Sequence, residues 1–222
     1  MTPFILVGSI ELENSENALK ERIGVSSLEY AQLVADRINE YLYYRYQDTK
    51  IWATADIILE FLSFDENSNL SRYLSEVKEH YKDYYYVICL NDKGQVIASS
   101  DQGIIGTHLS SEKGFWEAMN GNSYIQDVEY NRVALGYTIV FYVPVKSNSG
   151  KVVGVLSSAL KWSKVHEMVY KLQIRGKEQD VRNHIMVTNK DGLIISCFNP
   201  HEMFRDNLIQ LGMNSAKYAS KG

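Results

Sequence analysis

The chain has 222 residues, of which 45% are hydrophobic and 23% charged, a composition typical of a globular protein and not of a disordered one. The formal net charge of −4 comes without a basic stripe and gives no reason to expect nucleic-acid binding. The length allows one large domain or two small ones. Sixteen tyrosines against three prolines are unusual, and they suit a ligand pocket or the edge of a half-buried core.

The apolar run at residues 3–8 is far too short to span a bilayer, and no secretory signal is recognisable. This run is a short strand, the remnant of a membrane helix, or sequence derived from cloning. Cys89 and Cys197 each lie in an apolar run, far apart in sequence, so we expect two buried unpaired thiols.

The sequence predicts a long helix over residues 27–62, with Ser26 or Ser27 as its N-cap. Apolar residues recur there at intervals of three, four and seven, and neither Gly nor Pro interrupts the run. A continuous helix of this length measures about 54 Å. Such a helix must lie along more than one unit or pair with a copy of itself. Two ordinary helices that meet near residues 47–48 are the alternative.

A second helix follows a polar turn and is capped by Asn69 or Ser71. It carries an apolar stripe. The stripe comprises Tyr73, Leu74, Val77 and Tyr81.

The middle of the chain predicts a five-stranded antiparallel sheet with one open face, on which a small molecule binds. Aromatic and β-branched runs are separated by turn residues, and all connections are local. The expected strands cover residues 84–90, 95–99, 123–129, 134–144 and 152–160, with a short helix over 111–120. Alternation places Tyr84 and Tyr86 on one face of the sheet, and Tyr137 on the face opposite Tyr142.

The last part of the chain repeats what precedes it. After a helix over 163–172 and a charged connector over 173–182, the segment 189–196 matches 91–98 in kind. A strand over 184–187 precedes this second copy, and a helix over 201–211 follows it. Three strands are missing from the copy, because the chain is cut short or because the module is reduced.

The expected fold class is therefore α+β: a long N-terminal helix, a PAS-like antiparallel five-stranded module and a partial second PAS-like module. The expected domains are residues 1–83 with the two helices, 84–172 with the ligand-binding module, and 173–222 with the partial module.

This arrangement resembles the double Cache family, the extracytoplasmic sensor domains of prokaryotic chemoreceptors, histidine kinases and cyclases. The matching segments lie at residues 91–94, 106–111, 115–121, 143–145 and 150–156. The resemblance implies an extracytoplasmic domain of a cell-membrane protein, tethered to the membrane in the full-length protein. It also implies ligand binding in the membrane-distal module and a homodimer through the N-terminal helix.

Family members that bind amino acids use a Tyr, an Arg, a Trp-Tyr pair and two Asp. The positions that match the first of these read His108, Lys113, Phe115 and Trp116. Lys113 keeps a cation but cannot make the planar two-point contact of Arg. One Asp position is Ala159, and the other falls near Tyr130, with Asp127 close by. The resemblance therefore implies an organic acid or another small polar metabolite as the ligand.

The expected ligand-binding residues are Tyr86, His108, Lys113, Trp116, Tyr124, Asp127 and Tyr142. No catalytic or metal-binding residue and no cofactor is expected. The five histidines form no pair at metal-ligand spacing, and phosphate-loop, dinucleotide and serine-hydrolase motifs are missing. A cytosolic PAS-like dimerisation module without a small ligand is the alternative function, and a module that binds a cofactor such as haem is a weaker one.

Overall fold

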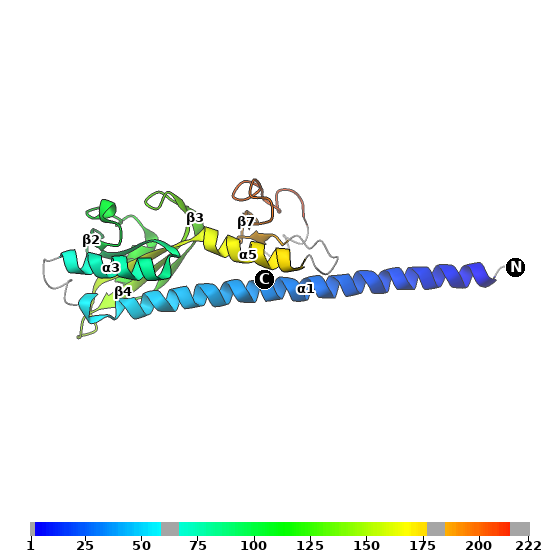
Figure 1. Ribbon diagram of the computed structural model, residues 1–222, viewed down its shortest axis with the longest axis horizontal. Helices are drawn as coiled ribbons and strands as arrows, with labels where there is room; N and C mark the ends of the chain where they lie inside the picture. Colours follow the sequence, from blue (N-terminus) through cyan, green and yellow to red (C-terminus); the bar gives the residue numbers. More distant parts are fainter. Residues whose placement is uncertain (1–2, 59–66, 177–184, 214–222) are drawn as a thin grey trace.

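The computed structural model describes residues 3–58, 67–176 and 185–213. Figure 1 shows one very long helix with a sheet module at one end and a smaller C-terminal unit beside the middle of the helix. The elements in chain order are α1 (Pro3–Ala53), α3 (Asn67–Tyr81), β1 (Tyr84–Leu90), β2 (Val96–Ser99), the 3-10 helix η1 (Gln102–Ile104), α4 (Lys113–Met119), β3 (Tyr124–Asn131), β4 (Gly136–Lys146), β5 (Val152–Lys161), α5 (Trp162–Gly176), β6 (Val187–Thr188) and β7 (Ile194–Ser196).

Helix α1 is continuous over 51 residues, about 77 Å at 1.5 Å per residue. The alternative break near residues 47–48 is therefore wrong, and so is a strand at residues 3–8. Ser26 and Ser27 lie inside the helix and cap nothing, because the residues before them are mostly good helix formers.

Helix α1 ends at Ala53, earlier than the predicted Leu62. The hydroxyl of Thr54 donates to the carbonyl of Ile51, and the backbone N–H of Thr54 bonds the same oxygen, which closes the last turn. Residues 59–62 of the prediction lie outside the described residues.

Helix α3 confirms the second predicted helix, but its start differs. It begins at Asn67, so the expected caps Asn69 and Ser71 lie within it. Leu74 is fully buried. The rest of the predicted stripe packs against the same core: Tyr73, Val77 and Tyr81.

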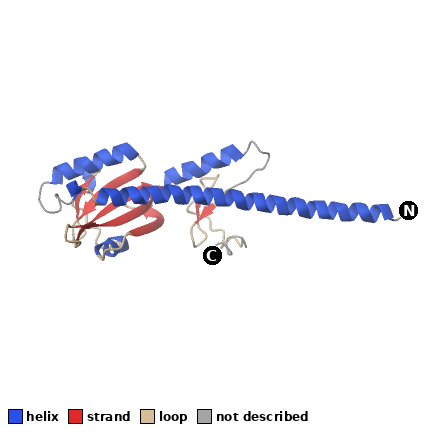
Figure 2. Ribbon diagram, turned by 90° about the horizontal axis from the view of Figure 1, so that it is seen from below, coloured by secondary structure: helices blue, strands red, loops and turns tan. Residues whose placement is uncertain are grey.

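The five middle strands form one antiparallel sheet, as predicted, and their order in it is β2-β1-β5-β4-β3. Figure 2 shows the sheet lying beside the end of α1. Short connections join β1 to β2, β3 to β4 and β4 to β5, but β2 and β3 lie at opposite edges of the sheet. The expectation that all connections are local is therefore wrong, because β5 pairs with β1 and the segment with α4 crosses from one edge to the other. The α+β fold class is confirmed.

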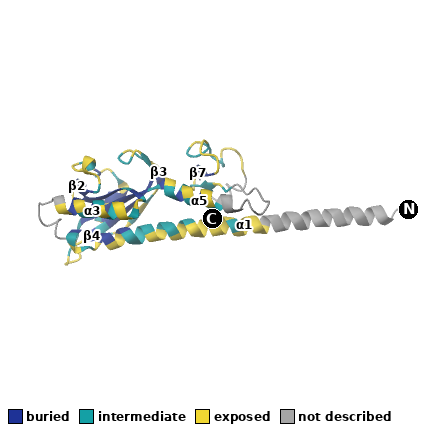
Figure 3. Ribbon diagram, in the orientation of Figure 1, coloured by how far each residue is buried: buried dark blue, intermediate teal, exposed yellow. Residues whose placement is uncertain are grey.

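The sheet has two different faces. Leu156, Leu160 and Phe141 face α1 and α3 in the larger apolar core, which the dark ribbon of Figure 3 marks. Val140, Tyr142 and neighbouring residues face α4 in a smaller core. The predicted opposition of Tyr137 and Tyr142 is confirmed.

The prediction that Tyr84 and Tyr86 share a face is wrong. Tyr84 belongs to the core against α1, and Tyr86 to the core against α4. The register of β1 against β5 shifts between these two residues, so simple alternation fails there.

The C-terminal unit packs on α5. The indole N–H of Trp162 donates to the carbonyl of Ile195 in β7, and His166 Nδ1 lies 3.0 Å from Ser196 Oγ. The ring of Phe204 stacks on Tyr137 of β4, with centroids 3.4 Å apart. Cys89 and Cys197 are buried and unpaired, as predicted.

The repeat is confirmed by matching turns 98 residues apart. The side-chain oxygen of Asn91 accepts from the backbone N–H of residues 93 and 95, and Asn189 does the same for residues 191 and 193. Gly94 and Gly192 close the two turns at φ of 75° and 83°, a region that favours glycine.

The helix predicted over 201–211 is wrong, because turns occupy this segment. Single turns close within the segment, but its backbone also pairs with β7: the N–H of Phe204 donates to the carbonyl of Ile194, whose own N–H donates to the carbonyl of Asp206. Asn207 also accepts bonds from the N–H groups of residues 209 and 210, which competes with a helix.

Candidate functional site

A cavity of about 240 Å³ lies on the α4 face of the sheet, bounded by β3, β4 and the loop before α4. It is smaller than the 300–1,000 Å³ of typical drug-sized sites, so it suits a metabolite of a few heavy atoms. The lining residues are Tyr86, Leu109, Glu112, Gln126, Glu129, Tyr130, Asn131, Arg132, Val133 and Tyr142.

Two buried tyrosines from different strands reach this cavity. Tyr86 is 3% exposed and accepts a hydrogen bond from Asn131 Nδ2 at 3.1 Å. Tyr142 is 2% exposed and donates to Gln126 Oε1 at 3.4 Å. Burial raises the pKa of Tyr86 to about 12, and burial also raises the pKa of Tyr142. Both phenols are therefore neutral at physiological pH.

Three charged side chains line the same cavity. Glu112 stands at the N-cap of α4, yet its carboxylate makes no capping hydrogen bond. Glu129 and Arg132 lie at and just beyond the end of β3. The pKa of Glu129 is raised by burial, by the charge of Glu112 and by the charge of Asp127. The cavity is therefore polar, with an excess of negative charge.

A β-bulge in β3 decides which side chains enter the cavity. The pairing with β4 shifts between Gln126 and Glu129. Val128 turns to the core against α1, while Gln126 and Glu129 both line the cavity. Asp127 is exposed within the bulge, and its carboxylate accepts from the N–H of Val128 at 2.7 Å. Asp127 therefore does not line the cavity.

Among the other expected binding residues, the structure brings only Tyr86 and Tyr142 to the cavity lining. Tyr124 packs beside the smaller core, 6.5 Å from the ring of Tyr142. Lys113 is exposed, with its ammonium 5.3 Å from the centre of the Tyr124 ring.

Trp116 and His108 lie on the surface near α4. Trp116 is 53% exposed, and its indole N–H donates to the carbonyl of Ser110 at 2.7 Å. His108 is exposed and forms a backbone bridge with Gln95. Neither residue lines the cavity.

Sequence reasoning missed most of the polar lining. The residues it did not name are Glu112, Gln126, Glu129, Asn131 and Arg132. Glu112 directly precedes the predicted Lys113, and residues 129–132 surround the position where the family has an Asp. Their proximity to those motif positions was the signal that could have found them. The bulge in β3, however, reverses the alternation from which the cavity-facing side chains would be assigned.

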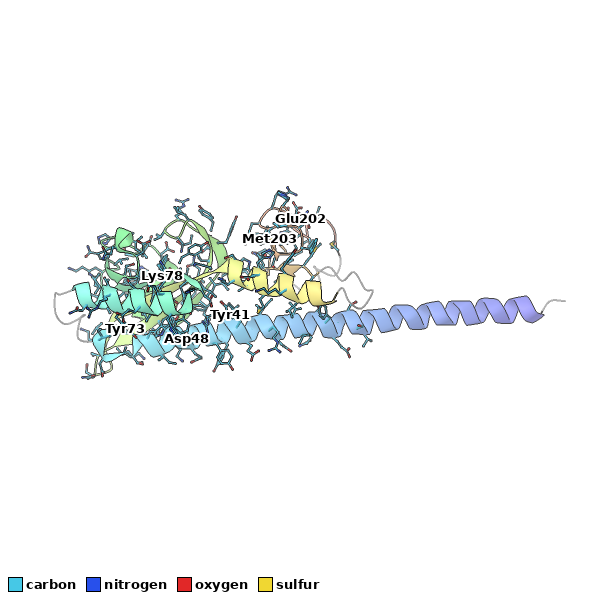
Figure 4. The ribbon with its side chains drawn as sticks, in the orientation of Figure 1. Tyr41, Asp48, Tyr73, Lys78, Glu202 and Met203 are labelled. Carbon is cyan, nitrogen blue, oxygen red and sulfur yellow. The ribbon has the colours of Figure 1, made fainter. Side chains whose placement is uncertain are left out.

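The other face of the sheet carries a polar network that joins it to α1. Arg45 bridges Asp48 at 3.2 Å and Asp83 at 3.5 Å, and Tyr41 donates to Asp83 at 2.9 Å. Tyr41 and Asp48 lie on the side of α1 that faces the domain (Figure 4). Thr49 and Ser158 of β5 share a buried hydrogen bond of 2.7 Å. These contacts fix the position of α1 against the strands that floor the cavity.

A larger groove of about 600 Å³ lies between α1 and α5, but it is more open and its charges are already paired. Lys164 and Lys171 both contact Glu167, and Arg37 bridges Glu40. We therefore place the candidate site in the smaller cavity. Residues 3–58, 67–176 and 185–213 hold no cluster of His, Cys, Asp and Glu suited to a metal ion. Within the same residues, no helix combines the length and the apolarity that a membrane span needs.

The strand order and a polar cavity on the face beside α4 define a PAS-like sensor module mounted on a long helix. The family model of the Cache domain matches residues 15–222, and the chain belongs to this family. The resemblance predicted from the sequence is thus confirmed. No curated protein matches the chain.

Solved sensor domains share the fold at low sequence identity. The sensory domain of the Campylobacter jejuni chemoreceptor Tlp3 superposes with a TM-score of 0.68 at 14% identity, over 84% of this chain and 76% of that one. The sensor domain of the Vibrio cholerae histidine kinase DctB superposes with a TM-score of 0.59 at 17% identity, over 84% of this chain and 74% of that one. The sensor domain of Escherichia coli DcuS superposes with a TM-score of 0.52 at 15% identity, over 60% of this chain and 98% of that one. Tlp3 structures similar to this chain include complexes with isoleucine and with L-valine.

Proposed function

We propose that this chain is the extracytoplasmic ligand-sensing domain of a transmembrane receptor of the histidine-kinase or chemoreceptor type. The observation that carries the proposal is a polar cavity on the α4 face of the sheet in a Cache domain. The domain itself is a binding module and not an enzyme. Its ligand is a small polar molecule, because the cavity measures about 240 Å³ and eight of its ten lining residues, all but Leu109 and Val133, carry a polar side-chain group.

Signalling in this proposal is a population shift. A ligand that moves a receptor from mostly off to mostly on needs about 5.5 kcal/mol of differential affinity for the two states. Charged hydrogen bonds in the cavity supply much of this difference. The contacts of Thr49 and Arg45 with the sheet side of the domain then pass the change in the strands to α1.

The proposal includes a homodimer through α1. Leu33, Tyr44 and Ile51 are 46%, 54% and 65% exposed. They follow one another at intervals of eleven and seven residues, so they lie on one side of the helix. The buried residues Val34 and Trp52 face the rest of the domain from a different side. An exposed apolar stripe on a long helix suits pairing with a second copy.

A thermal-shift screen tests the sensing function. The panel comprises organic acids, amines, amino acids and polyols at millimolar concentration. A compound that binds only the folded state at a hundred times its Kd stabilises the domain by about 2.7 kcal/mol. Tyr86→Phe, which removes a cavity hydroxyl, is expected to reduce the shift, whereas Tyr43→Phe on the exposed face of α1 keeps it. A panel without any hit, or a hit that Tyr86→Phe leaves unchanged, contradicts the proposed site.

A further inference from the structure

We propose that the ligand of this cavity carries a protonated amine, which the carboxylates of Glu112 and Glu129 bind. The inference rests on the proposed sensing function and names the chemical class of the ligand. It replaces the carboxylate ligand expected from Lys113, since Lys113 faces the ring of Tyr124 and does not line the cavity.

The first argument is the charge of the lining. Glu112, Glu129 and Arg132 are its charged members, which leaves a net charge of about −1 when all three are ionised. Within the described part of the chain, neither carboxylate takes part in an ion pair. A carboxylate ligand would meet two like charges here, whereas a monocation balances the site.

The field at the floor of the cavity has the same sign. The pKa of the Tyr142 phenol is raised first by burial and next by Tyr86, and then by the charges of Glu112 and Glu129. Glu129 itself is held above its ordinary pKa, first by burial and then by Glu112. The two carboxylates therefore repel each other and concentrate negative potential around Tyr142. An ammonium group between them relieves this repulsion.

The second argument is an unsatisfied set of buried polar atoms on this face of the sheet. The hydroxyls of Thr138 and Ser157 are buried and have no hydrogen-bond partner within the described residues. Thr138 lies two residues from Val140, which belongs to the core against α4, and it is opposite Glu129 in the register of β3 and β4. Ser157 is opposite Tyr142 in the register of β4 and β5. Neither residue lines the cavity itself, so these hydroxyls add polar character to this face of the sheet without contacting a ligand in the cavity.

Aromatic rings complete the environment that a cation prefers. Tyr86, Tyr130 and Tyr142 all line the cavity. An organic cation within about 6 Å of such a ring centre is attracted by the negative face of the ring, most strongly when the cation is desolvated. Arg132 and Glu129 are both exposed at the rim, where solvent screens their charges, whereas Glu112 is half-buried. The cavity thus combines two acids with aromatic walls, a chemistry that selects amines.

The test uses compounds that share a four-carbon chain and differ only at its ends: butylamine, 1,4-diaminobutane, 4-aminobutyrate, butyrate and butan-1-ol. Each compound is added at about 10 mM in a thermal-shift assay. Butylamine and 1,4-diaminobutane are expected to raise the melting temperature, and butyrate and butan-1-ol are not. Isothermal titration of the better amine then gives its Kd.

Charge-removing variants assign the amine to the two acids. Glu112→Gln and Glu129→Gln are each expected to weaken amine binding at least about tenfold, the loss of one charged hydrogen bond. Glu129→Gln is also expected to raise the melting temperature of the ligand-free domain, because it ends the repulsion with Glu112. Glu79→Gln, at an exposed position on α3, is the matched control and changes neither value.

The outcomes separate this inference from the sensing function. A rise in melting temperature with butyrate or butan-1-ol, or with 4-aminobutyrate alone, overturns the amine inference. If Tyr86→Phe abolishes that rise, the sensing function still stands. Amine binding that both Gln variants retain also overturns the inference, as does carboxylate binding that Lys113→Ala removes. If none of the five compounds raises the melting temperature but another compound in the wider screen binds at the cavity, the amine inference is overturned and the sensing function stands.

Discussion

Thr138 is a buried residue whose hydroxyl finds no partner among the described residues. Leaving a buried hydroxyl unsatisfied costs about 1–3 kcal/mol, whereas an apolar group of the same shape removes that cost. The conflict is local, because Val140 and Tyr142 beside it are packed in an apolar core.

We predict that Thr138→Val stabilises the ligand-free domain by about 1 kcal/mol, because it replaces an unpaired hydroxyl with a methyl group. Urea denaturation measures the change. Thr54→Val is the control, since that hydroxyl bonds the carbonyl of Ile51 at the end of α1 and its removal brings no gain. A loss of stability in Thr138→Val would show that the hydroxyl has an acceptor in solution.

His166 gives the C-terminal unit a pH dependence. Burial lowers the pKa of its imidazole, whose Nδ1 lies 3.0 Å from Ser196 Oγ. The folded state therefore keeps the ring neutral, while the unfolded chain binds a proton near pH 6.5. The contribution of His166 is complete above that pH and is lost as the pH falls through the lowered folded pKa.

We accordingly predict that wild-type protein loses more stability between pH 7.5 and pH 5.5 than His166→Gln does. Thermal unfolding at both pH values measures the difference. His80→Gln, on an exposed surface of α3, is the control and is expected to follow the wild type. Equal losses in wild type and His166→Gln would contradict the role of this imidazole.

At the scale of elements, α4 holds the floor of the cavity in place. A side chain at Gly114 would overlap the ring of Tyr142, so only glycine lets α4 approach β4 this closely. The approach needs no unusual backbone angle at Gly114, which makes the constraint one of space alone.

We predict that Gly114→Ala destabilises the domain by about 1–3 kcal/mol, the usual cost of overpacking. It is also expected to weaken ligand binding, because the ring of Tyr142 must move. Gly103→Ala is the matched control, since the added methyl group would meet only a side-chain oxygen of Asp101 at 3.4 Å. Equal stability of the two variants would contradict the close contact between α4 and Tyr142.

The elements were largely predictable from sequence, and the faces of the sheet were not. Strand formers bounded by Asn and Gly located β1 to β5 within a few residues, because local propensity and turn chemistry decide those bounds. Bulges in β1 and β3 depend on how the paired strands fit and reverse the alternation. Tyr84, Asp127 and Glu129 were misplaced or missed for this reason. The helix predicted over 201–211 is wrong because the backbone of this segment bonds β7, a tertiary contact that overrides helix propensity.

At the scale of the whole molecule, α1 lies along the domain and extends beyond it (Figure 1), and its exposed stripe of Leu33, Tyr44 and Ile51 is available to a second copy. We predict that Leu33→Glu or Ile51→Glu weakens dimerisation at least about tenfold, because a charge in an apolar helix contact is costly to desolvate. Sedimentation velocity over a micromolar concentration series measures it. Asn39→Glu adds the same charge at an exposed position off the stripe and is the control. A monomeric wild type would contradict the proposed dimer.

Strand β4 touches the cavity with Tyr142 on one side and the C-terminal unit with Tyr137 on the other. A tilt of this single strand therefore acts directly on the stacked Phe204, over a span of five residues along the chain. The domain then has a short mechanical route that bypasses α1. Occupancy of the cavity would reach the C-terminal unit as the loosening or tightening of one ring pair.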